Sequence, residues 1–456
     1  MHAPPKPYWP NCGGRPPVTG SLQRLAHRLP FFYGWIVLAS ASSTQVVRNA
    51  SASLTLAVFI YPLAADPELG WSRTLISGAA SVGGLAASAL SPLVGWLIDR
   101  YGARFVLASS VFIMGLATIS LAWATIPIFF YIFYGISRVI FASPIPIGAS
   151  VVVSRWFVRM RGRTNGILFA SHSIGLVAFP LIASAVIASH GWPAAWIVLG
   201  ALVWIIALVP VTILIVQQPE DLGLRPDGDP EPEMNGEDEG SGDNGDGTDG
   251  TAAEVPAPPE EPAWTLKEAM RTPALWILAA GVGTLFLVQA GINTHLAALL
   301  RDEGLSVFQS GLGLSLSAAF MGAGSLAWGW VAERFPVRYV LTGVAVAVAI
   351  PALLFLTTDT TFEGLAFSAL FGFGVGGMLS VPPVAYADYY GRRSLGAIRG
   401  VTEPFTSLEQ AIGTVAAGLV FDLTGSYDIA LTVFASLGGL TAVALLFARP
   451  PVRQTL

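Results

Sequence analysis

Twelve long apolar segments restrict the folds that this sequence can adopt. A helix that crosses a lipid bilayer needs about 20 mostly apolar residues, and twelve stretches meet that requirement. The first six are 33–63, 73–98, 104–123, 126–154, 164–189 and 193–216. The second six are 273–299, 306–332, 338–357, 361–388, 397–421 and 427–448. The pattern predicts an all-α polytopic membrane protein with twelve transmembrane helices.

The charge content agrees with a protein whose outer surface faces lipid. Charged residues make up 12% of the chain and hydrophobic residues 53%, whereas a soluble protein has roughly 25% charged residues. The sequence has no basic stripe of the kind that nucleic acid requires. We therefore expect the lipid bilayer and a small molecule as partners, and no nucleic acid.

The chain divides into five parts. They are a disordered cytoplasmic tail (1–30), an N-terminal six-helix bundle (31–217), an acidic cytoplasmic linker (218–264), a C-terminal six-helix bundle (265–449) and a second cytoplasmic tail (450–456). Within the linker, residues 227–262 hold 13 Asp or Glu and no Lys or Arg, so they cannot bury enough apolar surface to fold. Placing both termini in the cytoplasm puts 20 of the 24 Lys and Arg there. We expect a multi-pass protein of the cytoplasmic (inner) membrane.

A shift of 234 residues aligns the two halves without a gap. Residues of four loops pair at this one offset: Gly70 with Gly304, Gly95 with Gly329, Asp99 with Glu333, Arg100 with Arg334, Arg104 with Arg338, Gly162 with Gly396, and Gly191 with Gly425. A single offset over four loops argues against chance matches among many glycines. The sequence therefore predicts a tandem duplication of a six-helix unit, related by an axis along the membrane normal.

The loop Gly95–Arg104 has the strongest pattern of the four. Gly95 lets its helix approach a neighbour closely. Asp99, at the end of that helix, is placed to cap the start of another helix or to pair with an arginine. Gly102 permits the tight turn that follows. The alternative is an ordinary basic loop that only sets the membrane topology, but the recurrence at Gly329–Arg338 favours a specific role.

This loop resembles the motif between the second and third helices of the major facilitator superfamily, and the resemblance covers residues 31–449. It implies two pseudo-symmetric six-helix bundles that move by alternating access around a central cavity lined by helices 1, 4, 7 and 10. The second copy departs from the motif, because Pro336 replaces the turn glycine. The two loops would be gates between the halves, formed by Gly95, Asp99, Arg100, Gly102, Arg104, Glu333, Arg334 and Arg338.

Four segments resemble bacterial relatives of the monocarboxylate transporters and oxalate:formate antiporters. They are Gly34-Trp35, Arg155–Gly166, Gln218–Gly228 and Phe421–Tyr427. Two features depart from that group. Ser53 lies near the place of a basic residue in helix 1, and helix 8 (306–332) lacks an Asp/Arg pair. The substrate chemistry of that group is therefore not carried over.

Two arginines fall inside predicted helices that line the cavity. Arg48 is near the middle of helix 1 and Arg138 near the middle of helix 4, and the first half offers neither an acid at membrane depth. A charged group inside the bilayer is costly and is a functional candidate by default. Guanidinium groups hold carboxylates through two hydrogen bonds. We expect an anion site; the alternative is that each arginine bonds backbone carbonyls or an acid of the other half.

Further polar residues at membrane depth are candidate ligands or proton carriers. The substrate candidates are His295, Asn293, Gln289, Gln45 and Tyr61, and the proton-coupling candidates are Glu403, Glu409 and His172. Burial in apolar surroundings favours the neutral form of a carboxyl group, which suits a proton carrier. The alternatives are packing roles for the two histidines and, for the two glutamates, a structural salt bridge to Arg138 or Arg399.

The function that fits these features is secondary active transport of a small organic anion, a carboxylate, coupled to protons or exchanging one anion for another. Two alternatives stay open: a membrane sensor or receptor on the same fold that does not transport, and an exporter of another small molecule. The sequence has no phosphate-binding loop, metal-ligand cluster or nucleophile–base motif, and Cys12 is its one cysteine. We expect no enzymatic activity, no cofactor, no metal, and a monomer.

Overall fold

The structure, a computed structural model, describes residues 20–228 and 263–451. All of its regular elements are helices. The elements of the first half are α1 (Gly20–Arg28), α2 (Gly34–Val47), η1 (Arg48–Ser51), α3 (Ser53–Ala65), α4 (Arg73–Tyr101), α5 (Ala103–Ser120), η2 (Leu121–Trp123), α6 (Pro127–Ala142), α7 (Pro144–Trp156), α8 (Arg161–Val203), η3 (Trp204–Leu208), α9 (Val209–Leu214), η4 (Pro219–Leu222) and η5 (Pro226–Gly228). The elements of the second half are α10 (Leu266–Ala269), α11 (Pro273–Asp302), α12 (Val307–Ala332), α13 (Val337–Leu354), η6 (Phe355–Thr357), α14 (Thr361–Tyr390), α15 (Leu395–Thr424) and α16 (Asp428–Leu446).

Ten helical segments of the described ranges are long and apolar enough to cross a membrane. One of them, Arg161–Leu214, has 54 residues and would be about 80 Å long as a single helix, against a bilayer core of about 30 Å. Gly191 breaks it with φ 81° and ψ 172°, so this segment crosses twice. The charged helix α15 is not among the ten, but it packs lengthwise against α11 and α4. The predicted all-helical fold with twelve transmembrane helices is confirmed.

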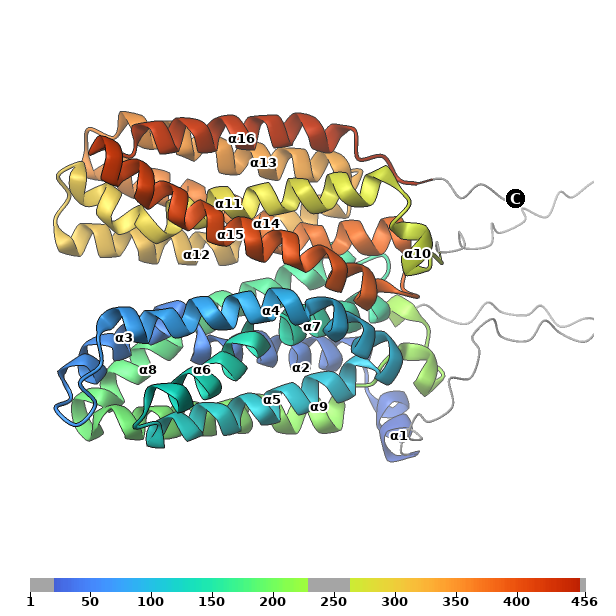
Figure 1. Cartoon of the computed structure of the whole chain (residues 1–456). Coiled ribbons are helices and arrows are strands. Elements are labelled where there is room, and N and C mark those ends of the chain that lie inside the picture. The colour runs from blue at the N-terminus through green and yellow to red at the C-terminus, as the bar shows by residue number, and fades with distance from the viewer. Residues whose placement is uncertain (1–19, 229–262, 452–456) are drawn as a thin grey trace, which may run out of the picture.

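The two halves form two bundles that lie side by side (Figure 1). Helices α2 to α9 make one bundle and α11 to α16 the other, and α1 and α10 lie at the same end of the molecule (Figure 1). Contacts between the bundles come chiefly from α4 with α15 and from α8 with α12. Large apolar side chains outside the cavity lining, such as Ile205, Leu423 and Leu440, are 71%, 76% and 67% exposed. Such a surface suits lipid rather than water.

The predicted boundaries need two corrections. Residues 20–28, assigned to a disordered tail, form α1, where Leu22 and Ala26 are buried on one side. The start of the predicted linker is also ordered: the Asp227 carboxylate accepts hydrogen bonds from the backbone N–H groups of residues 158, 159 and 160, at 2.8–3.2 Å. The rest of the predicted tails (1–19 and 452–456) and of the acidic linker (229–262) lies outside the described residues.

Candidate functional site: a charged cavity between the halves

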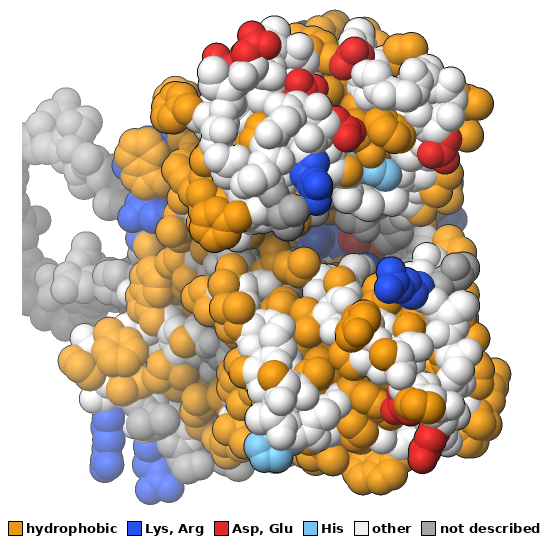
Figure 2. Space-filling view, turned by 90° about the vertical axis from the view of Figure 1, so that its left-hand side faces the viewer, with side chains coloured by type: hydrophobic (Ala, Val, Ile, Leu, Met, Phe, Trp, Pro, Cys, Tyr) orange, Lys and Arg blue, Asp and Glu red, His pale blue; other side chains and the backbone are white. Residues whose placement is uncertain are grey.

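A cavity of about 840 Å³ lies between the two bundles. Its walls come from η1, α3, α6, α7 and α8 of the first half and from α11, α12, α14 and α15 of the second. Figure 2 looks at the molecule from the end opposite α1 and α10, and it shows a hollow between the halves with charged side chains inside. We call this end the open face and the end with α1 and α10 the closed face.

Two broken helices position the arginines of the first half. The η1 turn separates α2 from α3, and Arg48 is its first residue. Ser143, with φ −124° and ψ −71°, and Pro144 separate α6 from α7. A break leaves backbone carbonyls without their helical partners. Arg48 Nη1 donates to the Phe141 carbonyl at 3.1 Å, beside the break between α6 and α7.

The two guanidinium groups lie against one aromatic ring. The Arg48 and Arg138 guanidinium carbons are 4.8 and 4.5 Å from the centre of the Phe141 ring. Cation–π contacts of this kind hold both groups in place without neutralising them. The Nε atoms of Arg48 and Arg138 are buried and have no hydrogen-bond partner among the described residues. Arg138 Nη1 donates to the Ser51 carbonyl at 3.5 Å. Because the Nε atoms have no acceptor, each arginine has a donor that no described residue uses.

The second half places one acid and one arginine at the same depth, both on α15. The Glu403 carboxylate accepts a hydrogen bond from Thr406 Oγ1 at 3.1 Å. Arg399, one helical turn away, crosses to the first half and donates to the Pro146 carbonyl at 3.3 Å and to Ser150 Oγ. Within the described part of the chain, no nitrogen–oxygen contact of 4.0 Å or less pairs Glu403 with an arginine. The cavity therefore holds three guanidinium groups and one carboxyl group.

Six of the predicted site residues line this cavity: Arg48, Arg138, His172, Gln289, Asn293 and Glu403. His172 is buried, and its Nδ1 is 3.0 Å from Asn49 Nδ2. Because an amide nitrogen donates, this contact makes Nδ1 the acceptor and leaves Nε2 carrying the proton. The structure thus brings residues of helices 1, 4, 5, 7 and 11 to one place.

Four predicted residues lie elsewhere. Tyr61 is 71% exposed on α3 and faces away from the cavity lining. His295 bonds the Tyr427 hydroxyl and the Thr414 carbonyl, both at 3.1 Å, and so ties α11 to the start of α16 and to α15. Gln45 is fully buried behind the cavity. Glu409 packs against Gly283 in the α11–α15 contact. Helical period alone could not show which side of each helix faces the cavity.

Sequence reasoning missed Arg399 and Phe141 as parts of the site. Arg399 entered only as a partner of Glu403, although the spacing of four residues places both on one side of a helix. The role of Phe141 depends on the break at Ser143, which turns α7 away from α6. The signal available for that break was the pair Pro144 and Pro146 within a long apolar run.

The duplicated loops lie at the closed face, where the halves touch. A Cβ atom on Gly95 would be 2.2 Å from the Gly396 carbonyl, and one on Gly329 would be 2.3 Å from the Gly162 carbonyl. These carbonyls belong to the opposite half in each case. Only glycine allows such an approach, so the first residue of each loop sets the closest contact between the bundles.

The acids of the two loops make equivalent contacts across the same interface. Asp99 accepts from the backbone N–H groups of Gly396 and Ala397 at 3.2 and 2.7 Å, at the start of α15, and from Arg155 Nη2 at 3.1 Å. Glu333 accepts from the backbone N–H of Arg163 at 2.8 Å, at the start of α8, and pairs with its guanidinium. An anion at a helix N-terminus is stabilised by the unpaired N–H groups there.

The other residues predicted as gates stay within their own half. Arg100 stacks over Trp96, and Arg334 stacks over Trp330 in the same way. Arg104 donates to the Thr212 carbonyl. Gly102 has φ 93°, as the turn requires, and Arg338 Nη2 donates to the Tyr339 hydroxyl at 2.9 Å. Their role as gating residues stays a prediction.

Comparison with known proteins places the chain in a family. The family model described as the Major Facilitator Superfamily matches residues 49–401 and 292–456. The chain belongs to the major facilitator superfamily. Curated relatives in this superfamily include the uncharacterized MFS-type transporter YcxA of Bacillus subtilis, 23% identical over 81% of this chain and 85% of that protein. Another is the fujikurins efflux protein of Gibberella fujikuroi, 24% identical over 78% and 70%. The niacin transporter NiaP of Acinetobacter baylyi is 25% identical over 64% and 66%.

Solved structures of the superfamily have the same fold. The human organic anion transporter MFSD10 aligns with a TM-score of 0.66 at 14% identity, over 92% of this chain and 100% of that one. FucP in the outward conformation aligns with a TM-score of 0.64 at 13% identity, over 91% and 98%. This protein is therefore a polytopic membrane transporter of the major facilitator superfamily, a family that is not enzymatic in general.

Proposed function

We propose that the protein is a secondary active transporter that moves an organic anion, a carboxylate, across the cytoplasmic membrane by alternating access. The observation that carries the proposal is the pair Arg48 and Arg138, which share the Phe141 ring in the cavity and have no acidic partner within hydrogen-bond distance among the described residues. With both termini in the cytoplasm, the closed face is the cytoplasmic one and the cavity is open to the outside. The unit that carries out transport is the monomer.

Arg48 and Arg138 each have a buried donor that no described residue accepts. A buried polar atom without a partner costs free energy, and a hydrogen bond to a charged group contributes about 1.5–3 kcal/mol. Arg48 and Arg138 line the cavity, so their guanidinium groups can supply this to a carboxylate that binds between them. A cationic substrate would meet three guanidinium groups against one carboxyl group. The charges therefore favour an anion over a cation as substrate.

Two of the related proteins support this substrate class and others leave the direction of transport open. Niacin, the substrate in the name of NiaP, is a carboxylate, and MFSD10 is described as an organic anion transporter. The fujikurins protein is described as an efflux protein. The proposal therefore covers movement in either direction. The resemblance to monocarboxylate and oxalate:formate relatives agrees with a carboxylate and stays a prediction about the subgroup.

Thermal-shift measurements against a panel of compounds test the anion site even while the natural substrate is unidentified. We expect aliphatic and aromatic carboxylates to raise the melting temperature of the purified full-length protein, because they bind the folded state. Alcohols and amines with the same carbon skeletons should raise it less. The Arg301→Ala variant, with its change on an exposed residue outside the cavity, is the matched control and should respond like the wild type. Equal shifts with carboxylates and amines would count against an anion site.

Glu403 is the proton-coupling candidate that the cavity favours. It is the one acidic residue among the described residues that line the cavity, and it lies on the same wall as Arg399. A proton on Glu403 removes a negative charge that would otherwise repel the incoming carboxylate. Proton-coupled uptake would then bring one proton with each anion, whereas anion exchange would need none.

The Glu403→Gln variant separates these mechanisms. If transport is proton-coupled, wild-type uptake into proteoliposomes rises as the outside pH falls, because binding requires the protonated acid. The Gln variant should lose this dependence, since its side chain is permanently neutral. Glu409→Gln is the matched control, on the same helix but outside the cavity lining. A pH dependence that survives in Glu403→Gln and disappears in His172→Gln would move the role to His172. No uptake of any carboxylate in any form would favour the sensor alternative.

A further inference from the structure

The cavity is much larger than a two- or three-carbon acid. Its volume of about 840 Å³ lies toward the upper end of the roughly 300–1,000 Å³ typical of pockets that enclose drug-sized ligands. A three-carbon acid at the arginines would leave most of that volume to water. The open face contributes an access path to this volume, and the remaining space admits a substrate larger than a three-carbon acid.

The charges of the cavity are concentrated in one part of it. The three arginines and Glu403 come from the middle of helices 1 and 4 and the first turns of α15. The rest of the described lining has no charged residue apart from the ionisable His172. Its polar groups are neutral serine, threonine, asparagine and glutamine side chains together with Tyr386. A ligand that fills the cavity thus has one place for an anionic group.

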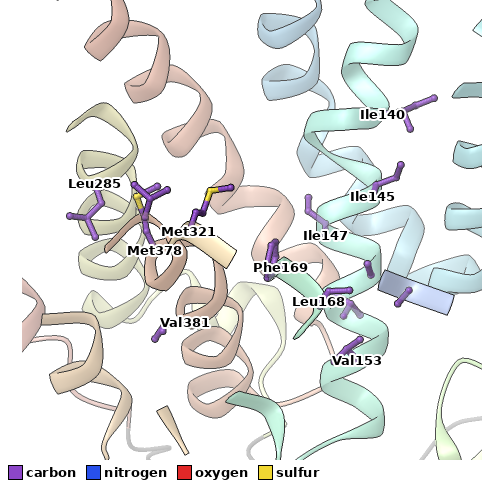
Figure 3. Packing of buried hydrophobic residues seen from close by; sticks show 14 of the residues in the cluster. Ile140, Ile145, Ile147, Val153, Leu168, Phe169, Leu285, Met321, Met378 and Val381 are labelled. Carbon is purple, nitrogen blue, oxygen red and sulfur yellow. The ribbon is translucent and has the colours of Figure 1, made fainter. Parts of the chain in front are cut away.

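The remaining walls are largely apolar and come from both halves. Phe169 contributes from α8, Phe286 from α11, Met321 from α12, and Val375 and Met378 from α14. Figure 3 shows Met321 and Met378 beside each other, with Phe169 on the side of the first half. Methionine side chains are flexible and polarizable, and they adapt to aromatic or irregular apolar groups. These walls favour a hydrophobic body rather than a chain of hydroxyl groups.

We infer that the substrate is an amphipathic monocarboxylate, with its carboxylate between Arg48 and Arg138 and an aromatic or aliphatic body against the walls formed by Phe286, Met321 and Met378. This rests on the proposed function, because the same arginines hold the anionic group, and it specifies the rest of the molecule. A body with a second carboxylate at its far end is disfavoured, since that charge would lie in the apolar part of the cavity without a partner.

Calorimetric titration of the purified full-length protein in detergent tests this inference. The probes are propionate, benzoate, 2-naphthoate and naphthalene-2,6-dicarboxylate, with naphthalene-2-methanol as the neutral analogue. We expect affinity to rise on the order of 100-fold from propionate to 2-naphthoate, because the larger body removes more apolar area from water. The dicarboxylate should bind at least about tenfold more weakly than 2-naphthoate.

Variants of the cavity residues distinguish binding of the apolar body from binding of the carboxylate. Phe286→Ala should weaken 2-naphthoate about tenfold and leave propionate unchanged, since only the larger probe reaches that wall. Phe105→Ala, which removes a 63% exposed side chain outside the cavity, is the control and should change neither. Arg138→Ala should weaken every carboxylate.

The outcomes for this inference and for the proposed function differ. Equal affinity for propionate and 2-naphthoate, with both lost in Arg138→Ala, would overturn the amphipathic substrate and keep the anion site. Binding of naphthalene-2-methanol as tight as that of 2-naphthoate, with no effect of Arg138→Ala, would overturn both. An affinity that rises with the apolar body and depends on both Arg138 and Phe286 supports the inference.

Discussion

Replacement of Arg138 by alanine is expected to lower carboxylate uptake by about 100-fold or more, and Arg48→Ala should do the same. Each change removes one of the two guanidinium groups that contact the Phe141 ring and so one of the two proposed partners of the carboxylate. Loss of one member of a buried, hydrogen-bonded charge pair costs about 2–5 kcal/mol, and every 1.4 kcal/mol is tenfold. The measurement is initial uptake into proteoliposomes of the carboxylate that gives the largest thermal shift.

Two further variants make this result specific. Arg138→Lys keeps a positive charge but loses the planar fork that binds a carboxylate through two hydrogen bonds, so an intermediate rate is expected. Arg301→Ala, outside the cavity, should transport at the wild-type rate. Size-exclusion profiles and melting temperatures of all variants establish that they fold. Wild-type uptake in both Arg48→Ala and Arg138→Ala would remove the basis for an anion site.

Alanine at both Gly95 and Gly329 is expected to prevent the closed face from closing. The new Cβ atoms would lie 2.2 and 2.3 Å from carbonyl oxygens on the opposite half, and the atoms in the way are backbone. Overpacking of this kind costs about 1–3 kcal/mol per site, so two sites shift the equilibrium away from the closed arrangement by roughly 30-fold or more. Transport should fall accordingly, because alternating access requires both faces to close in turn.

Thiol labelling tests whether the closed face opens in the double glycine variant. In a Cys12→Ser background, Ser150→Cys puts a reporter on α7 at a buried position that contacts Arg399 of the opposite half. Labelling should be faster in the double glycine variant than in the parent. A Cβ on Gly84, on the same helix as Gly95, would meet no described atom within 4 Å, so Gly84→Ala should label and transport like the parent. Unchanged labelling and transport in the double variant would show that these glycines do not limit closure.

The number and type of the helices could be predicted because the bilayer imposes a simple length and polarity rule. The apolar runs follow from it directly, and the long helices of the described residues correspond to them. The 234-residue offset also relates two contacts that the structure shows between the halves. Asp99 bonds the backbone N–H of Ala397, and Glu333 bonds that of Arg163, which are the same pair of positions exchanged between the halves.

The contents of the cavity could be predicted only in part. The sequence identified Arg48, Arg138 and Glu403 because charge at membrane depth is rare and stands out in an apolar run. It could not separate them from His295, Tyr61 or Glu409, which the structure places elsewhere. Apolar residues surround a membrane helix on all sides, since some face lipid and others face protein. The pattern that marks the buried side of a helix in a soluble protein is therefore weak here.

By itself the sequence determined the fold class, the two related halves and the charges available at membrane depth, because each follows from local composition or from a repeat. The tertiary structure alone decided which of those charges meet. That depended on the breaks at Arg48 and Ser143, which direct the carbonyls and the Phe141 ring toward the arginines. It depended also on the packing of α15 against the first half, which brings Arg399 to α7 and Glu403 into the cavity. Contacts between residues about 250 positions apart arise from packing, and no local pattern encodes them.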